Sequence, residues 1–274
     1  MKCIICKNDL HHFSNISFLD MPVSHCKNCD LYVTGNSEYG IKKKLRDIYS
    51  GEYWNEWNAE TSIKSNYTDA HSLGKYRDWT SQFSYCKKFL DKKSILEIGA
   101  GGGQTIFWFD QMNYNVIGIE PDSRNVDLIN KKLKNSKVIS SFIEDINLEQ
   151  KFDFIWMSHV LEHLVRPDLF LKKIKNNLNP NGFIFIEVPS SEHKENLQVS
   201  ILDHPHVYHF TKKSLIKLCE PYYDVVSCDC FRSASKIEGL VNKIFNRWNI
   251  FPYYPRISSD CKKGRDLRII LSIK

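Results

Sequence analysis

Residues 94–103, Ser-Ile-Leu-Glu-Ile-Gly-Ala-Gly-Gly-Gly, are the part of this sequence best suited to holding a ligand. Glu97 lies in a short apolar run typical of a buried strand, and Gly99, Gly101 and Gly103 follow it before a segment of helical character. Glycines let backbone N–H groups approach a ligand with no Cβ in the way, and the N-terminus of the next helix adds its dipole. The segment predicts a ligand-binding strand–turn–helix unit, with an ordinary strand–helix connection as the alternative.

Two acids follow the glycine turn at the spacing of a nucleoside-binding site. Residues 115–120 predict a second strand ending in Glu120, about 20 residues beyond the glycines, where a carboxylate can accept both hydroxyls of a ribose. A third predicted strand starts at Val138 and closes on Asp145. Gln104 stands where a dinucleotide fingerprint would require glycine or alanine, so the turn does not favour NAD.

The series Glu-x-Gly-x-Gly-x-Gly, two strand-ending acids and the apolar run 152–157 resembles motif I and the following motifs of the class I S-adenosylmethionine (SAM) methyltransferases. The resemblance implies an α/β, Rossmann-like, doubly wound sheet of seven mostly parallel strands with SAM in the glycine cleft. It implies that Glu120 holds the ribose and Asp145 the adenine amino group. The residues expected to bind the cofactor are Glu97, Gly99, Ala100, Gly101, Gly103, Glu120, Pro121, Asp145, Ser158 and His159.

Two cysteine pairs near the start, Cys3-x-x-Cys6 and Cys26-x-x-Cys29, have the spacing of zinc knuckles. Four thiolates fill a tetrahedral shell, so a zinc ion there has no open position for a substrate and its role is structural. The segment between the pairs is too short to build its own core, so the metal would stabilise the fold. A redox dithiol or a chance pairing is the alternative. The other cysteines are expected to be buried thiols: Cys86, Cys219, Cys228, Cys230 and Cys261.

Two histidine-bearing segments follow the fourth and fifth predicted strands of the sheet. The first reads Ser158-His159-Val-Leu-Glu162-His163, and the second reads Asp203-His204-Pro-His206-Val-Tyr208-His209-Phe210-Thr211. Ligands of open parallel sheets bind outside the carboxyl ends of the strands, so both segments should meet at the cofactor. On a helical turn the first segment would place its two histidines and its glutamate on one face. Histidines that only cap helices and pack the loop are the alternative.

The cysteine pairs, the stretch Tyr49-Ser-Gly-Glu-Tyr53-Trp54 and both histidine segments resemble the N-terminal two thirds of bacterial deoxysugar C-methyltransferases. The match implies His206 as the catalytic base and His163 as a second active-site histidine; Glu162 and His209 complete the catalytic candidates. An imidazole suits this task, because its unperturbed pKa of about 6.5 leaves it largely neutral at pH 7.

Three departures from that family change the expected reaction. Pro205 and His209 replace the family's Glu and Tyr, and its large C-terminal domain has no counterpart. We therefore expect O-methylation of a nucleotide-linked or glycan sugar for a bacterial surface polysaccharide, with sugar C-methylation as an alternative.

Further alternatives stay open. The ubiquinone-pathway O-methyltransferases have an acid-x-x-Glu-His sequence after strand four that can bind a divalent metal, and here His159, Glu162 and His163 stand at those positions. Such a catalytic metal is the less favoured expectation. An RNA methyltransferase with a zinc module is disfavoured by dispersed charge and by helices with few arginines. A SAM- or zinc-binding regulator without activity is disfavoured by acids and histidines at every expected cofactor position.

Three segments are expected to position these residues. Residues 1–36 should form the zinc ribbon, 37–93 a helical lid or substrate cap rich in aromatic side chains, and 94–274 the SAM-binding domain. Within that domain, strands alternate with helices expected at 103–112, 122–134, 167–178 and 212–219. An insert at about 232–265, with a helix at about 235–248, should precede a final strand that the family inserts antiparallel.

The composition is that of a globular protein. The chain has 274 residues, of which 42% are hydrophobic, and a net charge of +6. No apolar run approaches the ~20 residues of a membrane span, and the start lacks the apolar core of a signal peptide, so we expect a cytoplasmic protein. Scattered lysine pairs fit solvated helix faces or attraction of an acidic small-molecule substrate; nucleic acid is not expected as a partner, and the oligomeric state is left undetermined.

Overall fold

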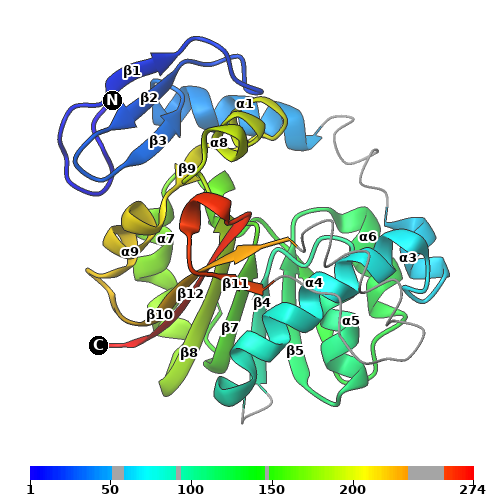
Figure 1. Ribbon diagram of the computed structural model, residues 1–274. Helices are drawn as coiled ribbons and strands as arrows, with labels where there is room; N and C mark the ends of the chain where they lie inside the picture. Colours follow the sequence, from blue (N-terminus) through cyan, green and yellow to red (C-terminus); the bar gives the residue numbers. More distant parts are fainter. Residues whose placement is uncertain (51–58, 91–93, 146–147, 234–255) are drawn as a thin grey trace, which may run out of the picture.

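An eight-stranded sheet forms the centre of the protein in the computed structural model, which describes residues 1–50, 59–90, 94–145, 148–233 and 256–274 (Figure 1). The strands pair in the order β6 (Lys137–Ser140), β5 (Asn115–Glu120), β4 (Ser94–Ile98), β7 (Phe152–Ser158), β8 (Leu178–Pro189), β12 (Asp266–Ile273), β10 (Tyr223–Arg232) and β11 (Arg256–Ser258). The five strands from β6 to β8 run parallel, and β12 is antiparallel to both of its neighbours. The predicted doubly wound, mostly parallel fold is therefore confirmed, including the antiparallel final strand.

The edge strand β11 corrects the expected number of seven strands. It comes from the segment that we expected to be only a connection, and it pairs antiparallel with β10 between Cys230 and Arg232. The helix expected at about 235–248 lies outside the described residues.

The central strands β4, β5 and β7 send alternate side chains into two separate cores, one on each face of the sheet. Ile95, Val116 and Trp156 belong to a core with α4 (Ala70–Cys86), α5 (Gln104–Gln111) and α6 (Ser123–Asn130). The intervening positions belong to a core with α7 (Pro167–Ile174) and α9 (Lys212–Cys219). Burial on both faces explains why these strands are apolar throughout rather than alternating.

The four helices expected in the segment 94–274 are present, and three of them are shorter than expected. The helix expected to reach residue 134 ends at Asn130, and the one expected to reach 178 gives way to a 3-10 turn, η3 (Lys175–Asn177). The helix α8 (Lys194–Leu202) was not expected at all. It lies directly before the second histidine segment.

The N-terminal segment 1–36, called the ribbon below, has three short antiparallel strands: β1 (His11–Ser14), β2 (Val23–Cys26) and β3 (Leu31–Thr34). A fourth strand, β9 (Tyr208–Phe210), comes from the second histidine segment and pairs antiparallel with β3, so that Tyr32 lies opposite His209. Figure 1 shows the ribbon beside α8 and β9. The ribbon therefore shares one sheet with a strand of the segment 94–274.

The segment expected to form a helical lid contains α1 (Glu38–Ser50), α3 (Glu60–Lys64), α4 and the 3-10 turn η1 (Lys87–Phe89). In α4, Trp79 packs its ring against Trp108 and Phe109 of α5, with ring centroids 5.3 and 5.4 Å away. This aromatic residue is thus part of the core. The expected aromatic residues at 53, 54 and 57 lie outside the described residues.

Two cysteines expected to be thiols form a disulfide. Cys230 of β10 and Cys261 of the 3-10 turn η5 (Cys261–Lys263) are bonded, with their Cα atoms 5.3 Å apart, because the hairpin after β10 returns the chain to the same place. Cys86, Cys219 and Cys228 are buried thiols, as expected. Across the described ranges, no helix is both long and apolar enough to cross a membrane.

Candidate active site

One cavity of about 1170 Å³ opens at the carboxyl ends of β4, β5, β7 and β8. The chain runs outward from β4 to β5 and β6, and then returns to the other side of β4 with β7, so the strand order reverses between β4 and β7. Open α/β sheets bind ligands outside such a reversal. All the residues expected to bind the cofactor line this cavity except Gly103.

The glycine turn is shaped by its backbone angles. Gly99, Gly101 and Gly103 have φ values of +76°, +54° and +80°, a region that favours glycine. A Cβ on Gly99 would lie 2.5 Å from Val160, and one on Gly103 would lie 2.7 Å from the Tyr67 hydroxyl, so both positions are packed. A Cβ on Gly101 would meet nothing within 4 Å, because this glycine faces the open cavity.

Two buried carboxylates, those of Glu97 and Glu120, lie next to the glycine turn. Glu120 accepts hydrogen bonds from the N–H of Gly101 at 2.7 Å and from the N–H of Asp122 at 3.0 Å. Burial raises the pKa of Glu120, and it raises that of Glu97 well above its usual range, with a further contribution from the charge of Glu120. Within the described chain, Oε2 of Glu97 is buried without a hydrogen-bond partner.

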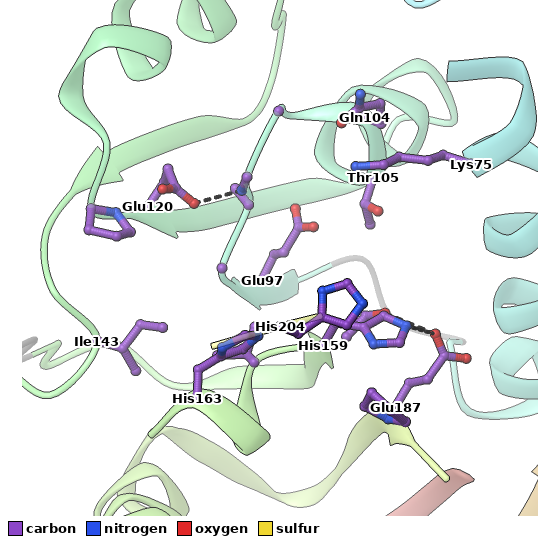
Figure 2. A pocket seen from close by; sticks show the side chains of 18 of the residues that line it. Lys75, Glu97, Gln104, Thr105, Glu120, Ile143, His159, His163, Glu187 and His204 are labelled. Carbon is purple, nitrogen blue, oxygen red and sulfur yellow. Dashed lines mark hydrogen bonds and ion pairs between the residues drawn. The ribbon is translucent and has the colours of Figure 1, made fainter. Parts of the chain in front are cut away.

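SAM fits this set of residues. Its ammonium and sulfonium are cations, which would compensate the unpartnered Glu97 oxygen, and the open side of Gly101 leaves room for a ligand against the backbone. Figure 2 shows Glu97 and Glu120 on one side of the cavity and His159, His163 and His204 on the other.

The third expected acid has a different setting from the one predicted. The strand expected to close on Asp145 ends at Ser140, because β6 is a short edge strand, and Asp145 follows in an exposed turn. Asp145 still lines the cavity, together with Phe142 and Ile143. Its adenine contact stays a prediction.

A buried polar network joins the ends of β7 and β8. Glu187 of β8 pairs with Arg268 of β12 and accepts hydrogen bonds from Gln82 of α4 and from the Ser158 hydroxyl. Nε2 of His159 lies 3.2 Å from the same Glu187 carboxylate. Although burial opposes it, Arg268 and His159 hold the pKa of Glu187 below its usual value.

Within this network, His159 has an uncommon backbone conformation and a raised pKa. Its φ of +56° is uncommon for a residue with a side chain. Desolvation opposes its protonation, but the carboxylates of Glu162 and Glu187 outweigh that cost and raise the pKa of His159 well above its usual range. His159 is thus a cation in the cavity wall rather than a proton acceptor.

The two histidine segments meet, as predicted. The N–H of Val207 donates to the carbonyl of Glu162, which lies in the 3-10 turn η2 (Leu161–His163). The fully buried Glu162 carboxylate lies 3.5 Å from Nδ1 of His159 and 3.9 Å from Nε2 of both His163 and His206. Burial lowers the pKa of both histidines, so both are neutral at pH 7.

The residues of the cavity that could bind a metal ion differ from the expected set by one member. Glu162, His163 and His206 place one ligand atom each within 4.8 Å of one another, so His206 replaces the expected His159 as the third member. In the ribbon, Cys3, Cys6, Cys26 and Cys29 gather equally closely, with Sγ of Cys6 and Cys26 3.6 Å apart. Zinc bound to sulfur at about 2.3 Å requires sulfur atoms about 3.8 Å apart, which these thiols can provide.

The fourth catalytic candidate, His209, does not line the cavity. It is buried in β9, where Nε2 lies 2.9 Å from the Thr34 hydroxyl and Nδ1 lies 2.7 Å from the Ser200 hydroxyl. Burial lowers the pKa of His209 to about 3. This histidine is therefore placed behind His206 and cannot touch a ligand in the cavity.

Several residues of the site were missed in the sequence. Glu187 had a visible signal, since it is an acid inside the apolar run of β8. Ser200 of α8, Gln82 of α4 and Thr34 of β3 had none, because their importance depends on contacts between segments far apart in the sequence.

Comparison with known proteins settles the family. Residues 65–222, more than half of the chain, match the profile of a family described as "Methyltransferase domain". The chain belongs to the methyltransferase-domain family. The class I SAM-dependent methyltransferase that the glycine turn predicts is thereby confirmed.

Similar solved structures share the fold. A SAM-dependent methyltransferase of Thermotoga maritima, titled a possible histamine N-methyltransferase, has a TM-score of 0.53 and 16% identity and covers 87% of this chain and 100% of its own. The 1,6-didemethyltoxoflavin-N1-methyltransferase of Burkholderia thailandensis, solved with S-adenosylhomocysteine, has a TM-score of 0.59 and 11% identity and covers 96% of this chain and 99% of its own. These identities establish the fold and no more.

Curated relatives carry another name than the one expected. The ubiquinone biosynthesis O-methyltransferases of Bradyrhizobium diazoefficiens and Pelagibacter ubique are 27% and 28% identical over 96 and 103 residues. The matches cover 34% and 36% of this chain and 38% and 43% of those proteins, so the chain spans less than half the length of each. They fit an alternative left open by the sequence, and the sugar substrate stays a prediction.

Replacing Glu120 by alanine should weaken SAM binding at least about tenfold, because charged hydrogen bonds contribute roughly 1.5–3 kcal/mol each. Calorimetry with SAM and S-adenosylhomocysteine would measure this. The exposed Glu149→Ala serves as the matched control and should bind normally. Tight binding of NAD without binding of SAM would contradict the assignment of the cavity.

Proposed function

We propose that this methyltransferase O-methylates a hydroxyl of a nucleotide-linked or glycan sugar used in a bacterial surface polysaccharide. The observation that carries the proposal is that His163 and His206 line the same cavity as the glycine turn and Glu97, with the Glu162 carboxylate directly behind them. Neutral histidines beside a methyl-donor pocket are suited to deprotonating an acceptor hydroxyl.

The chemistry divides between the cofactor and the protein. When bound, SAM supplies a methyl group already activated by its sulfonium. The protein has to orient the acceptor hydroxyl and to take its proton. A well-placed general base typically raises the rate by about 10²–10⁴-fold. Burial lowers the pKa of His163 and His206, so a neutral imidazole at this edge of the cavity can serve as the proton acceptor.

The charge at the cavity supports an anionic substrate such as a nucleotide diphosphate sugar. Lys42 and Arg46 of α1 and Lys75 of α4 line the cavity. Nearby acids are already engaged: Asp78 pairs with Arg265, and Asp69 caps the start of α4 by accepting from the N–H of Ser72. Lys42 and Arg46 therefore contribute positive charge to this part of the cavity wall.

A second candidate is O-methylation of a quinone-type small molecule with help from a divalent metal. It is favoured by the names of the curated relatives and by the cluster of Glu162, His163 and His206, whose donor set of two imidazoles and one carboxylate suits first-row divalent metals. In this case Glu162 would be a ligand rather than a partner of the histidines.

An acceptor screen separates the candidates. Purified protein is incubated with labelled SAM and either nucleotide sugars, quinone precursors or total RNA, each with and without a chelator. We expect label on a nucleotide sugar that is insensitive to the chelator. Transfer only to the quinone precursors, abolished by the chelator and restored by Mn²⁺ or Mg²⁺, would replace the first proposal by the second. Transfer to RNA alone would exclude both.

The pH profile should report the buried bases. Because burial lowers the pKa of His163 and His206, the acid limb of the kcat/KM profile should have its midpoint below the ordinary histidine pKa of about 6.5. An acid limb with its midpoint above 6.5 would contradict a base in this cluster.

We further propose that the ribbon binds one structural zinc ion through Cys3, Cys6, Cys26 and Cys29. Elemental analysis should give about one zinc per chain. Cys26→Ser should remove the zinc and lower the thermal stability, whereas Cys228→Ser, a buried thiol outside the cluster, should keep the metal. Zinc-free protein whose stability does not change in Cys26→Ser would contradict the proposal.

A further inference from the structure

A chain of hydrogen bonds runs from the ribbon to the cavity through four buried side chains. The Thr34 hydroxyl lies 2.9 Å from Nε2 of His209, and Nδ1 of His209 lies 2.7 Å from the Ser200 hydroxyl. The Ser200 hydroxyl in turn lies 2.9 Å from Nδ1 of His206. We call Thr34, His209, Ser200 and His206 the relay. It joins β3 to α8 and β9, which lie far from β3 in the sequence.

The number of protons in the relay allows two arrangements of its hydrogen-bond donors and acceptors. Both rings are buried, 6% exposed for His206 and 1% for His209, and among the described residues no carboxylate lies within hydrogen-bond distance of either ring, so each ring is neutral and carries one N–H. The Ser200 hydroxyl has one proton and stands between two Nδ1 atoms, so it donates to one and accepts from the other. His206 and His209 must therefore have opposite tautomers.

The two ends of the relay favour one of these states. Nε2 of His206 lies 3.9 Å from the Glu162 carboxylate, which can only accept, so the N–H of His206 belongs on Nε2. Ser200 then donates to Nδ1 of His206 and accepts from Nδ1 of His209. At the other end, the buried Thr34 hydroxyl donates to Nε2 of His209, so the hydroxyl proton of Thr34 has an acceptor.

His163 has the opposite tautomer for an independent reason. Its Nδ1 lies 3.2 Å from the carbonyl oxygen of Pro205, which can only accept, so the ring proton is on Nδ1 and the lone pair is on Nε2. The His163 side chain is also more open to the cavity, 21% exposed against 6% for His206.

We propose that these two histidines have different tasks: His163 is the base, and the relay holds His206 as a hydrogen-bond donor facing Glu162. This rests on the proposed O-methylation. The O–H bond of the acceptor breaks, the proton goes to Nε2 of His163, and the electron pair stays on the oxygen that bonds to the methyl carbon. The bond from that carbon to the sulfur of SAM would break at the same time, and its electron pair would leave with S-adenosylhomocysteine. Glu162, 3.9 Å away, stabilises the resulting imidazolium. Ser200, His209 and Thr34 are positioning residues.

The tautomers can be measured without any substrate. Two-bond ¹H–¹⁵N spectra of the ¹⁵N-histidine-labelled full-length protein, assigned with single variants, report which ring nitrogen carries the proton. We expect the proton on Nε2 in His206 and on Nδ1 in His163 and His209. A proton on Nδ1 of His206 and on Nε2 of His209 would overturn the proposal even if the enzyme methylates a sugar, so its failure is distinguishable from failure of the proposed function.

Ser200 variants test the positioning role. Ser200→Ala should mix the two tautomers of His206 and lower kcat about tenfold, with SAM affinity within about twofold, and Ser200→Thr should restore both. The matched control is Ser191→Ala, which removes a buried hydroxyl that has no hydrogen-bond partner in the described chain. A Ser200→Ala protein that binds SAM normally and keeps the His206 tautomer would refute the relay.

Glutamine substitutions separate donor from base. A glutamine amide can replace an Nε2–H donor but cannot accept a proton, so His206→Gln should keep turnover within about tenfold, while His163→Gln should lose at least about a hundredfold. SAM calorimetry confirms that each variant is folded. The reverse order of the two effects would assign the base to His206 and overturn the proposal.

Discussion

The backbone pairing of β3 with β9 is the interaction on which the arrangement of the catalytic side of the cavity depends. Three register pairs, from Leu31 opposite Phe210 to Val33 opposite Tyr208, fix the second histidine segment against the ribbon. A strand of three residues cannot hold its own conformation, so β9 exists because β3 offers it a ladder. Its side chains then place His209 against Thr34, and the preceding residues place His206 against Glu162.

The methyl-donor side of the cavity is held by different forces. Here the parallel sheet positions the glycine turn and two buried acids, Glu97 and Glu120. Burial disfavours the charged form of both carboxyl groups, and a cationic ligand can offset this cost. On the far side the ion pair of Glu187 and Arg268 is fully buried, and its hydrogen bonds to Gln82 and Ser81 fasten α4 to the sheet. Removing either charge would leave the other buried and uncompensated, which is strongly destabilising.

The sequence predicted what depends on local pattern. Apolar runs predicted the strands, and glycines predicted the turn. Strand-ending acids and histidines predicted the wall of the cavity, because the carboxyl ends of parallel strands meet at one edge of a sheet. What it could not predict depends on contacts across long separations. Thr34 and His209 are 175 positions apart, β9 has no pattern of its own, and the disulfide of Cys230 and Cys261 needs the hairpin to be known.

Through the contact of Thr34 with His209, the ribbon can influence the reaction in the cavity. Two cysteines of its cluster, Cys26 at the end of β2 and Cys29 in the turn before β3, lie next to β3, which carries both the ladder to β9 and the hydroxyl of Thr34. Distortion of the cluster would therefore displace β9 and the tautomer-setting hydroxyl together, although no cysteine touches the cavity. A zinc ion bound there, as proposed above, would act on the reaction through the backbone register of β3 and β9, although it would have no open coordination site for a substrate.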